Sequence, residues 1–288
     1  MNPSLKAMLQ KYPLGTSDQY RHALREILQE LVLCGLWRTK FFEHALFYGG
    51  TALRILHGLE RYSEDLDFSL LKSDLNFRWE PYGHAVVEEL RSWGFQVDLQ
   101  IKEKDSGSNI QSAFLKSDTT QALLAIEAPA SLLGFGPSGK LLKIKIEVDT
   151  LPPQGFTDES KVVLQPIPFS VRTMTLPSLF AGKMHAVLCR GWANRVKGRD
   201  WYDLVWYVSR SVPLDLGHLE IRMRQSGHWS SQSPLDEPQF RDLMFRRIEG
   251  LDVESAKQDV QNFLRDPAAL QLWSRDFFNE ITGRIQIL

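Results

Sequence analysis

Hydrophobic residues recur along this chain with two different spacings, and each spacing predicts its own kind of element. Helical spacing marks residues 17–37, with Ser17 and Asp18 as candidate N-terminal caps, and it returns at residues 51–57 and 80–93. Alternation of apolar and polar residues predicts three strands, at residues 63–71, 95–102 and 141–149. Helices and strands are therefore mixed in this part of the chain.

The connecting segments are mostly polar or glycine-rich, and the C-terminal part has mainly helical spacing. Residues 103–120 are polar and predict a loop, residues 122–127 a further strand, and the glycine-rich residues 134–139 a turn. Later, helical spacing dominates at residues 176–190, 199–210 and 236–287, with an exposed loop or linker at 226–238. We therefore place a boundary near residue 170, between a mixed α/β domain (1–170) and a helical domain (171–288).

Composition narrows the class of protein without naming an activity. The 288 residues are 43% hydrophobic, which is enough for a large core and excludes global disorder. Lysine and arginine number 34 against 35 acidic residues, so a protein that coats nucleic acid or membrane by bulk positive charge is excluded. The N-terminus lacks a signal-peptide pattern, and no apolar run is long enough to span a bilayer, so we expect no membrane association and a cytoplasmic location.

Cysteine and histidine are too sparse to predict a metal or disulfide framework. Cys34 and Cys189 cannot by themselves supply a four-ligand zinc site, and each is interpreted as a small buried residue in a helix. The seven histidines are spread thinly, and none forms a pair with zinc-protease spacing. Only His185 stands out, because it lies close to Lys183 in the sequence.

Two aspartates carry the clearest chemical signal. In the strand predicted at 63–71, Asp65 and Asp67 alternate with apolar residues and therefore share one face. Like charges this close repel each other unless a cation lies between them, and paired carboxylates suit Mg²⁺ or Mn²⁺. The alternative is a solvated strand face without a metal.

A glycine pair precedes the aspartates by a distance compatible with one site. Gly49 and Gly50 stand before a short predicted helix, where backbone N–H groups can bind phosphate, and Thr51 adds a hydroxyl group. A lone glycine pair is usually only a turn, but the pair and the aspartates together are more specific. If the strand at 141–149 lies beside the aspartate strand, Glu147 becomes a third carboxylate; the alternative for Glu147 is a cross-strand ion pair.

Basic residues gather in one acid-free stretch of the second domain. Lys183 falls on the apolar side of its predicted helix, so it is either a triphosphate contact or a lysine reaching solvent from the edge of that side. Arg190, Arg195, Lys197 and Arg199 follow, and this run is interpreted as a patch for phosphate or RNA, or as a solvated helix end. Directly after the run, a further acid pair shares one helix face: Asp200 and Asp203.

The ordered series of these motifs resembles a known family. GGTALR, RYSEDLDF, KIEVD, the lysine helix and RVKGRDWYDL, over about residues 46–210, look like the AbiEii/MenT nucleotidyltransferases, which are toxins of type IV-like toxin–antitoxin and phage-defence systems. The resemblance implies an α+β fold, with a polymerase-beta-type core of mixed sheet and flanking helices followed by a helical C-terminal domain. It also implies an NTP substrate, a divalent metal ion and a cognate antitoxin protein.

The resemblance also implies roles for the residues already named. It places the phosphate motif on Gly49, Gly50 and Thr51, the metal-binding pair on Asp65 and Asp67, and the motif lysine on Lys183. The acid of the last motif falls on either Asp200 or Asp203, where it would position Lys183 or the nucleotide. Glu147 would complete the metal site and activate the attacking hydroxyl, and Arg199 would join the nucleotide-binding residues.

The activity expected from these roles is nucleotide transfer from NTP to RNA, with the tRNA 3′ end as acceptor and a block of translation as the result. The basic run would touch the tRNA backbone, with three candidate RNA contacts: Arg190, Arg195 and Lys197. One alternative keeps the core and transfers to a protein hydroxyl or a small molecule. Another, of a different class, is a non-catalytic protein that binds RNA or a partner.

Overall fold

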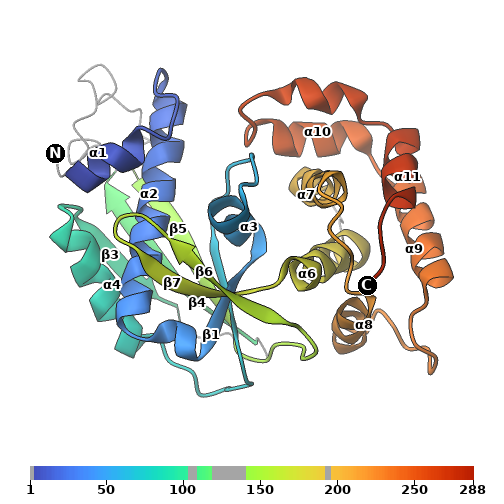
Figure 1. Ribbon diagram of the computed structural model, residues 1–288, viewed down its shortest axis with the longest axis horizontal. Coiled ribbons are helices and arrows are strands. Elements are labelled where there is room, and N and C mark those ends of the chain that lie inside the picture. Colours follow the sequence, from blue (N-terminus) through green and yellow to red (C-terminus); the bar gives the residue numbers. More distant parts are fainter. Residues whose placement is uncertain (1–2, 103–108, 119–140, 192–195) are drawn as a thin grey trace. The chain divides into compact units, whose positions relative to one another are not determined.

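The structure is a computed structural model that describes residues 3–102, 109–118, 141–191 and 196–288 (Figure 1). The chain divides into two compact units. Unit 1 consists of Met1–His57, Ser63–Pro152 and Ser160–Thr173, and unit 2 of Gly58–Tyr62, Pro153–Glu159 and Met174–Leu288. The pattern along the chain predicts one boundary near residue 170, whereas two short earlier segments also belong to unit 2. The strand and turn predicted at 122–127 and 134–139 lie outside the described residues.

A mixed sheet of seven strands, most of whose residues belong to unit 1, has the order β3-β4-β5-β2-β1-β7-β6. Its strands are β1 Ala45–Tyr48, β2 Leu66–Leu70, β3 Val97–Ile101, β4 Ile110–Asp118, β5 Leu141–Asp149, β6 Asp158–Val163 and β7 Phe169–Met174. The β2 strand runs parallel to β5 and β1 runs parallel to β7, whereas the pairs β1–β2, β3–β4 and β4–β5 are antiparallel.

The helices of unit 1 are α1 Pro3–Leu9, α2 Ser17–Arg38, the 3₁₀ helix η1 Phe41–Glu43, α3 Gly49–His57 and α4 Glu80–Ser92. The α2 helix begins with a capping box, in which Thr16 accepts from the Gln19 N–H at 3.3 Å and the Gln19 side chain accepts from the Thr16 N–H at 3.1 Å. The prediction that Ser17 and Asp18 cap this helix was wrong, because both residues lie inside its first turn.

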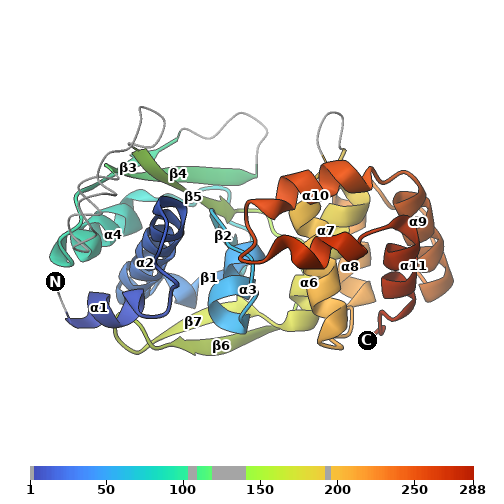
Figure 2. The same ribbon diagram turned by 90° about the horizontal axis from the view of Figure 1, so that it is seen from above.

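The core of unit 1 lies between the sheet and its helices. Figures 1 and 2 show α2 and α4 side by side against one face of the sheet. The apolar side chains of β5 and β2 that the alternation predicted to face the core are all buried: Leu142, Ile144, Ile146, Val148, Leu66, Phe68 and Leu70. This burial fixes which way the intervening polar residues point, since neighbouring residues of a strand face opposite sides.

Several elements differ from the expectations from sequence. The loop predicted at 103–120 was wrong for its second half, because Ile110–Asp118 forms β4 between β3 and β5. Only Ala113, Leu115 and Ser117 of β4 are buried, so its hydrophobic pattern is weak. The strands β6 and β7 and the helix α8 were not predicted at all, although Asp215 caps α8 in the ordinary way.

Unit 2 is helical apart from short strand segments. Its helices are α6 Leu176–Cys189, α7 Gly198–Ser209, α8 Leu216–Gln225, α9 Glu237–Glu249, α10 Val253–Gln261, the 3₁₀ helix η4 Pro267–Leu272 and α11 Arg275–Gly283. Aromatic side chains fill its core; Phe180 of α6 stacks on Tyr207 of α7, with ring centroids 4.4 Å apart. The class is α+β, as predicted. None of the helices described here has the length and hydropathy needed to cross a bilayer.

Candidate functional site

The predicted third carboxylate lies beside the aspartate pair. In the parallel pairing of β2 with β5, Asp67 is the direct register partner of Glu147. Side chains of register partners project from the same face of a sheet, so these two carboxylates are neighbours. Asp65 stands two positions before Asp67 and is only partly buried, like Asp67. The strand order thus brings all three predicted acids to one region of unit 1.

Gly49 places the first turn of α3 directly against this acidic region. The helix begins at Gly49, two residues earlier than predicted, and Gly49 has φ of +80°. A Cβ atom at this position would lie 2.5 Å from Oδ2 of Asp67, so a larger residue would have both strained backbone and a clash with the carboxylate. The partial positive charge of the helix N-terminus therefore lies next to Asp67, where it also favours a bound phosphate.

Thr51 holds this arrangement together from inside the protein. Its side chain is fully buried, and Oγ1 hydrogen-bonds to Ser63 Oγ at 2.8 Å and to the carbonyl oxygen of Asp65. The hydroxyl that was expected at the phosphate is thus hydrogen-bonded to the segment that carries the aspartates. Thr51 therefore links the first turn of α3 to the segment that carries Asp65.

Two residues of α2 that were not predicted as site residues support the same segment. Gln29 Nε2 donates to the carbonyl oxygens of Ser63 and Glu64, at 3.3 and 3.0 Å. Arg25 Nη1 pairs with Glu64 Oε1 at 3.1 Å. Burial lowers the pKa of Arg25, and the nearby charges of Glu64 and Asp65 oppose that shift. These residues are 34 or more positions from their partners, so no local pattern indicated them.

The oxygen ligands of this region fit a hard divalent cation. Carboxylates are the side chains that Mg²⁺ prefers, and it commonly binds one or two of them together with substrate phosphates. Glu147 also contacts Lys145 Nζ at 2.7 Å and accepts from Ser112 Oγ at 3.2 Å. Across the described residues, the three acids do not bring one oxygen each within 4.8 Å of one another. Register therefore makes them neighbours, without gathering their oxygens around one point.

The predicted lysine and the second acid pair meet in unit 2. Lys183 of α6 lies 2.7 Å from Asp200 Oδ1 and 2.8 Å from Asp203 Oδ2, both on α7. The Lys183 side chain is 14% exposed and that of Asp203 is fully buried. Burial alone would lower the pKa of Lys183, but the two aspartates outweigh it and raise the pKa. Lys183 is therefore charged and paired with both candidate acids.

Arg61 completes this buried network and was not predicted. Its Nε and Nη2 atoms donate to the two carboxylate oxygens of Asp203, each at 2.6 Å. Burial alone would raise the pKa of Asp203, but the charges of Arg61 and Lys183 lower it. Arg61 and Asp203 are 142 positions apart in the chain, so their pairing had no signal in the spacing of residues.

The basic run is partly neutralised by the same acids. Arg190 Nη1 pairs with Asp200 Oδ2 at 3.1 Å, and the Arg190 side chain is 55% exposed. The guanidinium of Arg199 lies 4.3 Å from the ring centroid of Phe263, and Lys197 immediately precedes α7. Arg195 lies outside the described residues. Arg190 is thus the exposed end of an ion-pair network. The buried part of this network consists of Asp200, Lys183 and Asp203.

The predicted site residues therefore form two sets, each within its own unit. Unit 1 holds the glycine pair, Thr51 and the three acids of the sheet, and unit 2 holds the lysine, the two acids of α7, Arg61 and the described basic residues. Both sets consist of residues that are distant in sequence. Each set is assembled by the packing of its own unit.

Comparisons with solved structures find similar chains of low identity. JHP933 from Helicobacter pylori is 16% identical, with a TM-score of 0.48, over 90% of this chain and 89% of that chain. A candidate nucleotidyltransferase from H. pylori is 17% identical, with a TM-score of 0.46, over 90% of this chain and 91% of that chain. An antigenic nucleotidyltransferase-like protein from Paracoccidioides brasiliensis is 13% identical, with a TM-score of 0.43, over 84% of this chain and 95% of that chain.

Family comparison gives a more extensive match. No curated protein sequence matches the chain. The family model described as "Nucleotidyl transferase AbiEii toxin, Type IV TA system" matches residues 31–277, which include every element that carries a candidate site residue. With most of its length matched, the chain belongs to the AbiEii nucleotidyl transferase family of type IV toxin–antitoxin systems.

Proposed function

We propose that this protein is a metal-dependent nucleotidyltransferase that adds nucleotides from NTP to the 3′ end of tRNA and so blocks translation. The observation that carries the proposal is the parallel pairing of β2 with β5, which sets Asp67 beside Glu147 while Gly49 opens a helix against Asp67. Acids beside a helix N-terminus suit a triphosphate accompanied by its metal ion.

The residues of unit 1 have distinct roles in this proposal. Asp65, Asp67 and Glu147 would hold Mg²⁺ or Mn²⁺, which when bound polarises the phosphate that is attacked. Backbone N–H groups at Gly49 and Gly50 bind the phosphate oxygens and orient the NTP. Glu147 accepts the proton of the attacking 3′-hydroxyl. The new oxygen–phosphorus bond forms at the α-phosphate, and pyrophosphate leaves as the old bond breaks.

The residues of unit 2 contribute the positive charge expected for the triphosphate and for RNA. Lys183 is held in one orientation by Asp200 and Asp203, and Arg61 fixes Asp203 in turn. In this role Lys183 binds the triphosphate, and the two aspartates position Lys183 together, so neither acid alone needs to be the acid of the last motif. Arg199 joins the nucleotide contacts, whereas Arg190, Arg195 and Lys197 contact the RNA backbone.

The toxin–antitoxin membership supports an inhibitory product and a protein partner. The matched family is described as a toxin of a type IV system, so a cognate antitoxin is the expected partner. A tRNA without a free acceptor end cannot be aminoacylated, and extension of that end would stop translation. In keeping with this activity, we place the protein in the cytoplasm and give it a role in phage defence.

The test is transfer of label from each of the four NTPs, in the presence of Mg²⁺, to purified tRNA. Periodate-oxidised tRNA, which has lost its 3′-terminal diol, serves as the matched acceptor control. Label in intact tRNA and none in oxidised tRNA is the expected result. Label that enters protein or a small molecule instead would support the alternative acceptors, and tRNA binding without any metal-dependent transfer would support a non-catalytic RNA-binding protein.

A further inference from the structure

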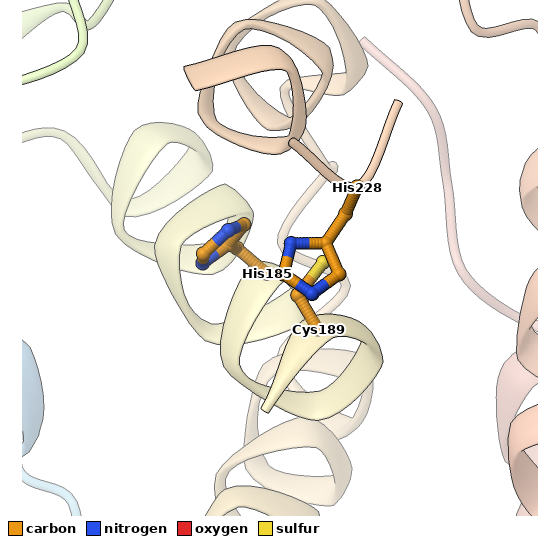
Figure 3. A group of neighbouring side chains, drawn as sticks. All are labelled: His185, Cys189 and His228. Carbon is orange, nitrogen blue, oxygen red and sulfur yellow. The ribbon is translucent and has the colours of Figure 1, made fainter. Parts of the chain in front are cut away.

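A second group of possible metal ligands lies in unit 2, away from the carboxylates of the sheet. His185 and Cys189 are four residues apart on α6 and therefore share a helix face, and His228 follows the end of α8. One ligand atom from each of the three side chains lies within 4.8 Å of the other two, and Figure 3 shows the three side chains clustered together. Both cysteines are free thiols; Cys34 is buried as predicted, whereas Cys189 is only partly buried.

The backbone after α8 holds His228 in place without help from a metal. The chain turns at Gly227, which has φ of +75°, and the His228 N–H donates to the carbonyl oxygen of Met223 at 2.8 Å. Arg224 donates to the carbonyl oxygens of Ser231 and Ser233, at 2.7 and 3.1 Å, and so fastens the segment that follows. The site is thus largely formed by the fold, which reduces the ordering that metal binding would require.

Ser226 orients both imidazole rings. Its Oγ lies 2.8 Å from His185 Nε2 and 2.9 Å from His228 Nδ1. Each ring has two nitrogens, so these hydrogen bonds leave a second nitrogen on each ring. Histidines that bind metals ordinarily hydrogen-bond through their other nitrogen in this way.

The charge state of the group also suits a metal ion that binds neutral imidazole. Burial, followed by the charge of Arg222, lowers the pKa of His185 to about 4, so this ring is neutral at physiological pH. Burial raises the pKa of Cys189 to about 11, while the nearby charge of Arg247 acts in the opposite direction. Metal binding would displace the thiol proton to solvent, and the thiolate would offset part of the positive charge that Arg222 and Arg190 bring.

We propose that His185, Cys189 and His228 together bind one Zn²⁺ ion. Two imidazole nitrogens and one thiolate are ligands that zinc favours over Mg²⁺, which prefers oxygen. The group contains no fourth histidine, cysteine or acid among the described residues, so water or an external ligand completes the tetrahedron. The ion would join the last turn of α6, the helix that carries Lys183, to the segment between α8 and α9.

The test uses tag-free, full-length protein that has been stripped of metal, with Mg²⁺ in excess to occupy the carboxylates of unit 1. Titration with Co²⁺ should give one equivalent bound, strong visible bands of tetrahedral cobalt and a near-ultraviolet thiolate charge-transfer band, all removed by Zn²⁺. Cys189→Ser should abolish the charge-transfer band, and His228→Ala should weaken Zn²⁺ binding at least about tenfold. Cys34→Ser is the matched control and should retain both properties.

Three outcomes would overturn the proposal. They are a weak spectrum of octahedral cobalt only, loss of the charge-transfer band in Cys34→Ser, and wild-type Zn²⁺ affinity in His228→Ala. His228 is exposed, so its replacement decides the matter even if Cys189→Ser fails to fold. Nucleotide transfer is not used as a readout, and the result is therefore independent of the proposed activity.

Discussion

The acids of the sheet in unit 1 and the acids of α7 in unit 2 differ in how far they are buried and paired. In unit 1, the acids of two parallel strands are neighbours on one face of the sheet, and Glu147 is 26% exposed. In unit 2, Asp203 is fully buried and receives two hydrogen bonds from Arg61 as well as an ion pair from Lys183. The first region is thus open to solvent at Glu147, whereas the second is closed to solvent at Asp203.

The difference in burial predicts how substitutions in each region affect activity and stability. Replacing a partly exposed acid changes the free energy of unfolding little, because water already solvates the carboxylate. A buried charge whose partner is removed remains uncompensated in a medium that solvates it poorly. Substitutions in the sheet region should therefore lower activity with little loss of stability, whereas substitutions in the buried network should lower stability as well as activity.

The largest effect is expected for Asp67→Asn, which keeps the size of the side chain and removes its charge. If the metal ion contributes several kcal/mol to the transition state, a loss of about 4 kcal/mol corresponds to about a thousandfold slower transfer. The urea midpoint of unfolding should stay close to that of the wild type. Asp149→Asn, on β5 two residues beyond Glu147, is the matched control and should retain transfer. Undiminished transfer by Asp67→Asn would show that Asp67 is not a required metal ligand.

The next effect is the converse, a loss of stability from Asp203→Asn. This change leaves Arg61 fully buried beside a neutral amide, and breaking a buried ion pair costs about 3–5 kcal/mol. Urea unfolding followed by circular dichroism measures the loss. Arg190→Ala removes the exposed member of the same network and should cost less than about 1 kcal/mol. Equal losses in the two variants would contradict the distinction between the buried and exposed ends.

The third prediction concerns Glu30 of α2, a buried acid of unit 1 that lacks such pairing. Its side chain is 6% exposed, Lys11 Nζ is 3.6 Å away, and Oε2 has no hydrogen-bond partner among the described residues. Burial raises the pKa of Glu30 from 4.5 to about 7, whereas the pKa of Asp203 is lowered. Burial without strong pairing and burial with it thus shift the two acids in opposite directions.

The sign of the pH dependence follows from proton binding. Between the unfolded and folded pKa values of Glu30, only the folded protein holds the proton, so the free energy of unfolding falls as pH rises from 4.5 to about 7. Glu30→Gln mimics the protonated acid and should add on the order of 3 kcal/mol above this window and almost nothing below it. The stabilisation from Asp203 is present above its ordinary pKa and is lost only on further acidification. A gain for Glu30→Gln that is independent of pH would contradict this account.

The smallest effect tests how closely α3 approaches the acids. Gly49→Ala should slow transfer about tenfold. The new methyl group would clash with the Asp67 carboxylate and push it from its position, and a tenfold slower rate corresponds to about 1.4 kcal/mol in the activation free energy. Gly94→Ala is the matched control, since Gly94 has φ of +89° but open space around its Cβ position. Both variants should lose about 1–2 kcal/mol of stability from backbone strain. Equal activities would show that the clash does not reach the site.

The sequence predicted some elements well because their hydrophobic patterns were strong. The strand at 141–149 has the bounds predicted for it, since four buried apolar residues alternate with polar ones. The adjacent β4 has only three buried residues, one of them a serine, and it was mistaken for a loop. Charged residues likewise obscured the edge strand β6. Pairing with neighbouring strands supplies the hydrogen bonds that a weak pattern cannot indicate.

The sequence patterns of β7 and α8 are ordinary ones, although neither element was predicted. Phe169, Val171 and Thr173 of β7 alternate and are buried, as in any half-buried strand. Helix α8 follows Asp215, a capping residue, and buries Leu219 and Met223 on one face. These two elements were within the reach of sequence reasoning, whereas partners far apart in the chain were not.

By itself, the sequence determined the α+β class, the membership of a nucleotidyltransferase family and the alternation that buries Leu66, Phe68 and Leu70 and leaves Asp67 on the opposite face of β2. These features follow from local periodicity and from motifs in a fixed order. The predicted strand was too long at its start, because β2 begins at Leu66 and Asp65 immediately precedes it. Only the tertiary structure decided that Glu147 lies beside Asp67, that Arg61 pairs with Asp203, and that His228 meets His185 and Cys189. Such contacts depend on how strands pair and helices pack, which residue spacing along the chain does not encode.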